Sequence, residues 1–238
     1  MFSLIKNPLT DKIKPLDSQI EENDPNQALP KLSNNFMWII SGGAGSGKTN
    51  LLLNMLSIPH NQGGMGKYYN KIYFVSPTGS LDPKLDELLS ELEPEQKYDE
   101  LNDENITSII KDIRSQEDFK KEHYLLVLDD CLNELPNTIS KSKIHQFIIS
   151  RRHLHCSVVV LTQSYVRVPN LWRRNCNLIS FFASNNRKEV ESLIQDINDD
   201  PDKMGILLKF ATQEPHSFLT IKMGVLKPVY YKKFDRIQ

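Results

Sequence analysis

The sequence has few cysteines and no long hydrophobic run, and each shortage excludes a class of protein. No apolar stretch reaches the roughly 20 residues that a membrane-spanning helix requires. The first residues become polar too quickly for a secretory signal. The three cysteines, Cys131, Cys156 and Cys176, are odd in number and widely spaced, which is typical of buried thiols in a reducing compartment. We therefore expect neither a secreted disulfide scaffold nor a protein that spans a membrane.

Acidic residues are missing from one long stretch and concentrated in another. Between residues 141 and 188 there is no Asp or Glu, and every charged side chain is a Lys or Arg. Residues 82–118 show the opposite pattern, with acids far outnumbering bases. This asymmetry is compatible with two solvated faces, or with a basic surface that binds nucleic acid or nucleotide phosphates.

The hydrophobic pattern predicts a mostly parallel α/β fold. Five short apolar runs follow one another, and such runs are typical of strands buried on both faces. We place these strands at residues 36–40, 71–76, 124–128, 157–161 and 178–182. Helices are predicted at residues 48–56, 82–92, 105–113, 141–150, 187–197 and 201–211, before a closing strand pair at 217–222 and 229–234. Alternating strands and helices favour a sheet with helices on both faces.

Two regions stand outside this pattern. Residues 1–34 are polar and contain four prolines, so we predict an N-terminal arm or lead-in ahead of one domain at residues 35–238. The acidic residues between the predicted helices at 82–92 and 105–113 are expected to form a surface loop.

A glycine-rich loop lies between the first predicted strand and the first predicted helix. It is a full match to the pattern G-x-x-x-x-G-K-[ST] and reads Gly42, Gly43, Ala44, Gly45, Ser46, Gly47, Lys48, Thr49. Glycines let backbone N–H groups turn inward around phosphates, and the following helix adds the positive end of its dipole. We expect Lys48 to contact the β- and γ-phosphates of ATP, and Thr49 to ligate Mg²⁺.

Polar residues end two further strands that we expect to reach the same edge of the sheet. Asp129 and Asp130 follow the strand at 124–128 in a Walker B pattern, so Asp129 is predicted to hold Mg²⁺ directly or through water. Asp130 stands where many P-loop ATPases carry a glutamate that polarises the attacking water. Thr162 and Gln163 end the strand at 157–161. Because an amide both donates and accepts, Gln163 is a candidate sensor of the nucleotide state.

Four arginines are candidates for an arginine finger, which stabilises the charge of phosphoryl transfer. They form two adjacent pairs: Arg151, Arg152, Arg173 and Arg174. Neither pair lies close in sequence to the P-loop or to the two aspartates. We therefore expect a finger to act in trans, from a neighbouring subunit of a ring. The alternative for each pair is a solvated cation or one that interacts with a helix dipole.

The order of these motifs resembles that of the FtsK–HerA superfamily of P-loop ATPases. It is similar in particular to the viral genome-packaging branch found in poxviruses, giant viruses and virophages. The resemblance covers most of residues 36–238. Its most specific parts are the pair Asp129-Asp130, the run from Arg151 to Gln163, and the run from Pro169 to Asn175.

The resemblance implies a RecA-like ATPase domain in which the strand bearing Thr162 and Gln163 lies between the P-loop strand and the Walker B strand. It implies ATP and Mg²⁺ as cofactors and double-stranded DNA as a partner. It also implies a homo-oligomeric ring, a pentamer or a hexamer, at a capsid or portal protein. Such a motor acts in the host cytoplasm, in a viral factory, or in the virion.

The residues alone leave three other functions open. The first is a nucleoside or nucleotide kinase, but such kinases place the P-loop almost at the N-terminus, whereas 41 residues precede it here. The second is a helicase-type or chromosome-segregation ATPase with the same core and another partner. The third is a scaffold that binds nucleotide without turnover, and Asp129 and Asp130 argue against it.

Overall fold

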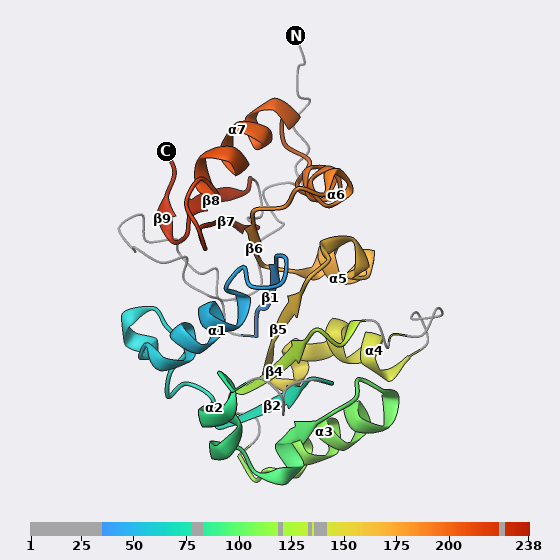
Figure 1. The fold of residues 1–238 in the computed structure, drawn as a ribbon. Helices are drawn as coiled ribbons and strands as arrows, with labels where there is room; N and C mark the ends of the chain where they lie inside the picture. The colour runs from blue at the N-terminus through green and yellow to red at the C-terminus, as the bar shows by residue number, and fades with distance from the viewer. Residues whose placement is uncertain (1–34, 78–82, 119–120, 133–134, 136–141, 224–226) are drawn as a thin grey trace, which may run out of the picture.

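The computed structural model describes residues 35–77, 83–118, 121–132, 135, 142–223 and 227–238 (Figure 1). The arm predicted at residues 1–34 lies outside the described residues. Asp82 and Lys141, the first residues of two predicted helices, lie outside them as well. No helix in the described ranges has both the length and the apolar character needed to cross a bilayer.

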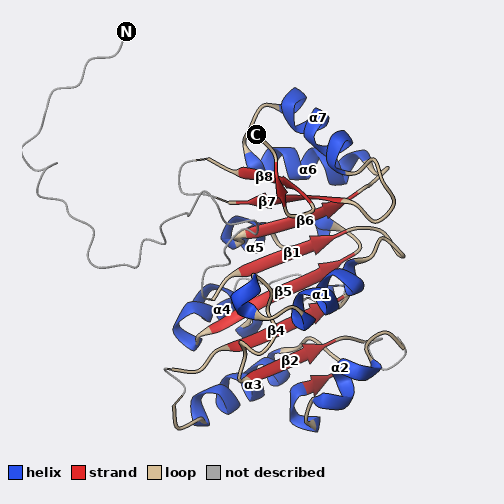
Figure 2. Ribbon diagram, turned by 90° about the vertical axis from the view of Figure 1, so that its left-hand side faces the viewer, coloured by secondary structure: helices blue, strands red, loops and turns tan. Residues whose placement is uncertain are grey.

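The described strands form one sheet in the order β3-β2-β4-β5-β1-β6-β7-β8-β9 (Figure 2). They are β1 (Met37–Ser41), β2 (Lys71–Val75), β3 (Lys97–Tyr98), β4 (Tyr124–Asp129), β5 (Cys156–Thr162), β6 (Leu178–Phe182), β7 (Phe218–Lys222), β8 (Val229–Lys232) and β9 (Asp235–Arg236). Neighbouring strands are parallel from β3 to β6, whereas β6 to β9 pair antiparallel. The prediction of a mostly parallel sheet is confirmed.

Helices cover both faces of this sheet. In Figure 1, α1 and α2 lie on one side, and α3, α4 and α5 lie on the other. The α-helices are α1 (Lys48–Ser57), α2 (Asp86–Glu91), α3 (Asp103–Ser115), α4 (Lys143–Ser150), α5 (Asn170–Asn175), α6 (Arg187–Ile197) and α7 (Pro201–Ala211). Short 3-10 turns occur at η2 (His60–Gln62), η4 (Pro94–Gln96), η7 (Arg151–Leu154) and η8 (Tyr165–Arg167).

The central strands are buried on both faces, which explains their continuous apolar sequences. In β1, Met37 and Ile39 belong to the hydrophobic layer that includes residues of α3, α4 and α5, while Trp38 and Ile40 belong to the layer that includes residues of α1. All five residues of β1 are buried. The sheet therefore separates two hydrophobic layers. The three cysteines are free and buried, as the sequence predicted.

The acidic stretch contains more structure than the predicted surface loop. It includes the turn η4 and the strand β3, which pairs with β2 at the edge of the sheet. A strand of two residues is too short to show a period-2 pattern, so the loop prediction was wrong here. The helix predicted from residue 82 is shorter as well, since α2 begins at Asp86.

Two further helix boundaries differ from the prediction. Helix α5 was not predicted, because six residues after Pro169 are too few to show helical periodicity. Helix α4 begins at Lys143 rather than at residue 141. Its start is set by Ser142, whose hydroxyl oxygen accepts a hydrogen bond from the His145 N–H at 3.2 Å.

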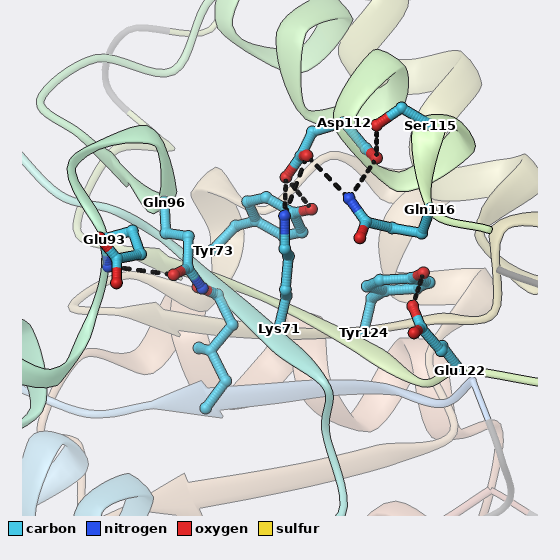
Figure 3. Close-up of polar contacts among 10 residues, drawn as sticks. Lys71, Tyr73, Glu93, Gln96, Asp112, Ser115, Gln116, Glu122 and Tyr124 are labelled. Carbon is cyan, nitrogen blue, oxygen red and sulfur yellow. Dashed lines mark hydrogen bonds and ion pairs between the residues drawn. The ribbon is translucent and has the colours of Figure 1, made fainter. Parts of the chain in front are cut away.

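Asp112 attaches α3 to the sheet (Figure 3). Its carboxylate accepts hydrogen bonds from Lys71 Nζ at 3.0 Å, from the Tyr73 hydroxyl at 2.7 Å and from Gln116 Nε2 at 3.0 Å. Burial by itself raises the pKa of Asp112, but the hydrogen bonds from Tyr73 and Lys71 outweigh it and hold the pKa below the ordinary value. The acidic helix α3 is thus held to β2 by an ionised carboxylate.

A buried hydrogen-bond chain joins β1, β6 and β7, where the sheet changes from parallel to antiparallel. Trp38 Nε1 donates to Ser180 Oγ at 3.1 Å, and Ser180 Oγ lies 3.0 Å from Thr220 Oγ1. All three side chains are fully buried. The Ser180 hydroxyl therefore serves two groups that water does not reach.

We expect Ser180→Ala to lower the free energy of unfolding by about 1–3 kcal/mol, because it leaves the Trp38 N–H and the Thr220 hydroxyl without this partner. Urea denaturation measures the change. Ser108→Ala is the matched control, since Ser108 is exposed and its hydroxyl donates to the Glu104 carbonyl of its own helix. The control should stay within about 0.5 kcal/mol of the wild type. Equal losses in both variants would contradict the role of the buried chain.

Candidate functional site

The glycine-rich loop connects β1 to α1 at the carboxyl edge of the parallel strands. The arrowheads of β1, β4 and β5 point to this edge in Figure 2. The Gly42 N–H donates to the Thr162 carbonyl oxygen at 3.1 Å, which ties the loop to the end of β5. Gly45 and Gly47 have φ values of 72° and 109°, a region that residues with a side chain rarely adopt.

Gly42 is required for a second reason, which is space. A Cβ atom at this position would lie 2.6 Å from Ser46 Oγ and 2.7 Å from Phe182 Cβ. Such distances are too short for any side chain to be accepted without movement of its neighbours. The loop is therefore packed tightly against the end of β6, and this packing requires glycine at position 42.

Lys48 is folded back over the loop that precedes it. Its ammonium donates to the carbonyl oxygens of Gly42 at 2.9 Å and Gly43 at 3.2 Å, and the residue is only 7% exposed. Burial lowers the pKa of Lys48, and the nearby carboxylates of Asp130 and Asp129 oppose that shift. The lysine and both aspartates thus lie close enough for their charges to interact.

The end of β5 brings Gln163 to the two aspartates. Strand β5 lies between β1 and β4, as the resemblance implied. Asp129, the last residue of β4, is buried, and its Oδ2 lies 3.4 Å from Ser76 Oγ. Asp130 has a left-handed φ of 48°, and its Oδ2 accepts a hydrogen bond from Gln163 Nε2 at 2.8 Å. The predicted acids, sensor and P-loop lysine therefore share one edge of the sheet.

A cavity of about 780 Å³ opens beside these groups. Its lining combines the P-loop with the residues that follow β4, β5 and β6. The lining residues are Gly43, Asp130, Leu132, Thr162, Gln163, Ser164, Arg167, Ala183, Ser184, Asn185, Asn186 and Glu189. Ligands of open α/β sheets bind in such a crevice at the carboxyl ends of the strands.

Two of the four arginine candidates are internal, which corrects the prediction for them. Arg151 is 1% exposed and donates to the backbone oxygens of Ile148 and Asn175 and to Asn177 Oδ1, at 2.9–3.1 Å. Burial lowers its pKa to about 10. It precedes β5, so it lies at the edge of the sheet opposite the P-loop. A buried guanidinium with these bonds cannot reach a nucleotide on a neighbouring subunit.

Arg173 is the second internal candidate. Its Nη1 lies 2.7 Å from Asp196 Oδ2, and its guanidinium lies over the Tyr165 ring at 5.1 Å. The side chain is 11% exposed. Arg173 thus joins α5 to α6 inside the protein, and we withdraw it as a finger candidate. Arg152 and Arg174 are exposed, and neither lines the cavity.

The cavity contains two charged residues that sequence reasoning missed. Arg167 lines it four residues after Gln163, from the turn η8. Only its position in the acid-free stretch could have drawn attention to it. Glu189, in the first turn of α6, is 7% exposed. Its carboxylate accepts hydrogen bonds from Ser164 Oγ at 2.6 Å and from the Val166 N–H at 3.1 Å. Glu189 thereby holds the turn after Gln163 against α6.

Comparison with known proteins places the chain in a family. The family model described as poxvirus A32 protein matches residues 27–211. The chain belongs to this family. Among curated relatives, the DNA packaging protein OPG160 of variola virus is 30% identical over 158 residues, which cover 63% of this chain and 53% of the relative. The vaccinia virus protein of the same name gives the same figures. This chain spans about half the length of these relatives.

Solved structures agree with the family assignment at the level of the fold. The crystal structure of B204, described as the DNA-packaging ATPase of Sulfolobus turreted icosahedral virus, matches with a TM-score of 0.60 and 14% identity. That match covers 84% of this chain and 98% of B204. The genome packaging NTPase of Sulfolobus turreted icosahedral virus 2, solved with ATP-gammaS, matches with a TM-score of 0.57 and 15% identity, over 83% and 96% of the two chains. The predicted P-loop fold and the resemblance to viral packaging ATPases are confirmed.

We expect Glu189→Ala to loosen the turn after Gln163, because Ser164 and Val166 both lose their acceptor. Hydrogen exchange at the Val166 amide should become faster by about tenfold, the equivalent of one hydrogen bond of about 1.4 kcal/mol. Glu189→Gln keeps one acceptor oxygen and should exchange at an intermediate rate. Glu191→Ala is the control, because Glu191 lies on the same helix and pairs with the exposed Arg187. Unchanged exchange in Glu189→Ala would show that the carboxylate does not hold the turn.

Proposed function

We propose that this chain is an ATPase motor that moves double-stranded DNA into a viral capsid. The observation that carries the proposal is the meeting of the P-loop, Asp129, Asp130 and Gln163 at one edge of the sheet, beside a cavity large enough for a ligand. Membership of the poxvirus A32 family supports it, and so do the relatives that are 30% identical, which are named DNA packaging proteins.

The nucleotide site is proposed to divide its work among these residues. The backbone from Gly42 to Gly47 binds phosphates, and Lys48 leaves its carbonyl partners to contact the β- and γ-phosphates. Thr49 and Asp129 are the proposed Mg²⁺ ligands. Their oxygen donors suit a hard cation. The buried Asp129 carboxylate lies close enough to Lys48 for the two charges to interact. When bound, the metal neutralises charge on the phosphate oxygens.

Asp130 and Gln163 are proposed to act on the attacking water. Gln163 Nε2 donates to Asp130, which leaves the amide oxygen of Gln163 to accept a hydrogen bond from water. The Asp130 carboxylate is then oriented to accept a proton from the same water. Asp130 is shorter than the usual glutamate. The hydrogen bond from Gln163 therefore helps to position the Asp130 carboxylate, and a longer side chain would need this help less.

DNA is proposed to lie along the face formed by α4, η7 and α5. This face carries the exposed cations Lys143, Arg152 and Arg174, all from the acid-free stretch. Exposed cations attract the phosphate backbone of any sequence. The same proposal includes a pentameric or hexameric ring, a capsid or portal partner for it, and a location in the infected cytoplasm or the virion.

We expect ATP hydrolysis by the wild-type protein to rise several-fold on addition of duplex DNA, and Lys48→Ala to abolish it while the fold stays intact. The lysine makes charge-assisted contacts worth roughly 1.5–3 kcal/mol or more. Release of phosphate measures turnover, and circular dichroism measures the fold. Lys121→Ala, at an 81% exposed side chain, is the control and should hydrolyse ATP normally. Turnover that requires a small phosphate acceptor would favour a kinase instead. Wild-type turnover in Lys48→Ala would remove the P-loop assignment.

The arginine finger is proposed to be one of Arg152 and Arg174, supplied by a neighbouring subunit, and the other arginine then stays on the face proposed for DNA. An alanine change at the finger should reduce turnover by about 10³-fold or more while ATP still binds. A mixture of that variant with Lys48→Ala should regain partial activity, because each subunit supplies what the other lacks. Arg167 lines the cavity of its own subunit, so it is the alternative in cis. If Arg167→Ala is the one change that removes turnover while ATP still binds, and mixing it with Lys48→Ala does not restore activity, the finger acts in cis. The case for a ring then weakens.

A further inference from the structure

A histidine distant in sequence is hydrogen-bonded to the P-loop. His216 lies in the turn between α7 and β7, and its Nδ1 is 3.0 Å from the carbonyl oxygen of Ser46, 170 residues away. A carbonyl oxygen can only accept, so Nδ1 is the donor in this contact and carries a proton. Neither the P-loop motif nor the Walker B motif involves this residue.

The backbone of His216 is held in an unfavourable conformation. Its φ is 59°, in the left-handed region. This conformation costs free energy in a residue that has a side chain, whereas glycine adopts it without that cost. Such a conformation persists only where its surroundings determine it, and it often marks a functional constraint. Here the turn is fixed on both sides. The Ser217 N–H donates to Glu214 at 3.1 Å, and Lys232 of β8 pairs with the Glu214 carboxylate at 2.8 Å.

The turn is also packed against the P-loop. Phe218, the first residue of β7, contacts Phe182 with ring centroids 4.9 Å apart. Phe182 and His216 together enclose Gly47, because a Cβ atom on Gly47 would lie 3.6 Å from His216 Nδ1 and 3.7 Å from Phe182 Cε1. The imidazole therefore lies directly against the peptide that joins Ser46 to Gly47.

Control of one carbonyl group also controls the next N–H group. The peptide unit is planar and trans, so the Ser46 C=O and the Gly47 N–H point in opposite directions. When His216 holds the carbonyl on the outer side of the loop, the Gly47 N–H faces the inner side. In a P-loop the inner N–H groups are the ones that bind phosphate. Gly47, with its φ of 109°, has little backbone preference of its own to keep this orientation.

We propose that His216 is a positioning residue for the phosphate-binding loop. By donating to the Ser46 oxygen, it fixes the peptide between Ser46 and Gly47 so that the Gly47 N–H is aimed at a bound phosphate. The inference rests on the proposed binding of ATP at this loop. It assigns a role in nucleotide affinity to the antiparallel end of the sheet, which carries none of the P-loop or Walker motifs.

The test compares two variants that both tolerate a left-handed backbone. His216→Asn replaces the imidazole Nδ1–H with an amide N–H at a similar distance from the backbone, and Asn adopts this conformation readily. His216→Gly removes the donor and the conformational cost together. We expect the Kd for ATP, measured by equilibrium titration without turnover, to rise about three- to tenfold in His216→Gly and to stay within about twofold of wild type in His216→Asn. At saturating ATP, kcat should stay within about twofold in both variants.

A matched control and a second donor-free variant complete the design. Lys67→Gly changes an exposed residue that also has a left-handed φ of 59°, at the edge of the sheet opposite the P-loop, and should leave ATP affinity unchanged. If His216→Gly does not fold, His216→Ala lacks the donor as well and takes its place. Wild-type affinity in the donor-free variant would overturn the proposal, and so would an Asn variant as weak as the Gly variant. A wild-type protein that binds no ATP would instead refute the proposed function itself.

Discussion

The position of β5 between β1 and β4 is the constraint on which the candidate site depends. In this register Ser41 lies beside Thr162, and Asp129 lies beside Leu161, so the three strands end at the same level. The P-loop follows β1, Asp129 ends β4, and Asp130 and Gln163 directly follow β4 and β5. One backbone hydrogen bond, from Gly42 to Thr162, then fixes the P-loop against the end of β5. Residues separated by more than a hundred positions meet because parallel strands share a direction.

Much of this arrangement could be predicted because it has local causes. Buried parallel strands read as apolar runs, the glycines of the P-loop match its backbone angles, and polar residues directly follow β4 and β5. The strand β3 and the helix α5 could not be predicted, since they are too short to show a period. Arg167, Glu189 and His216 were missed for another reason. Their significance comes from partners across the fold, and no local pattern distinguishes them from surface residues.

The arginines show how a charge pattern can mislead when burial is unknown. The stretch without acids looks like a continuous basic surface in the sequence. In the structure, Arg151 donates to backbone oxygens at the ends of α4 and α5 inside the protein, and Arg173 pairs with Asp196 from α6, an acid that lies outside the stretch. These two cations are part of the packing of α4, α5 and α6. Arg152 and Arg174, which immediately follow them in sequence, are the ones that remain available to a partner.

The reversal of strand direction between β6 and β7 has a consequence for how the chain can change in evolution. Because β7 runs antiparallel, it begins at the edge where the P-loop lies, and the turn that precedes it reaches the loop directly. The family model ends at residue 211, the last residue of α7, just before that turn. A lineage could therefore keep every motif of the family region unaltered and still lose a contact to its phosphate loop through a deletion or substitution a few residues downstream.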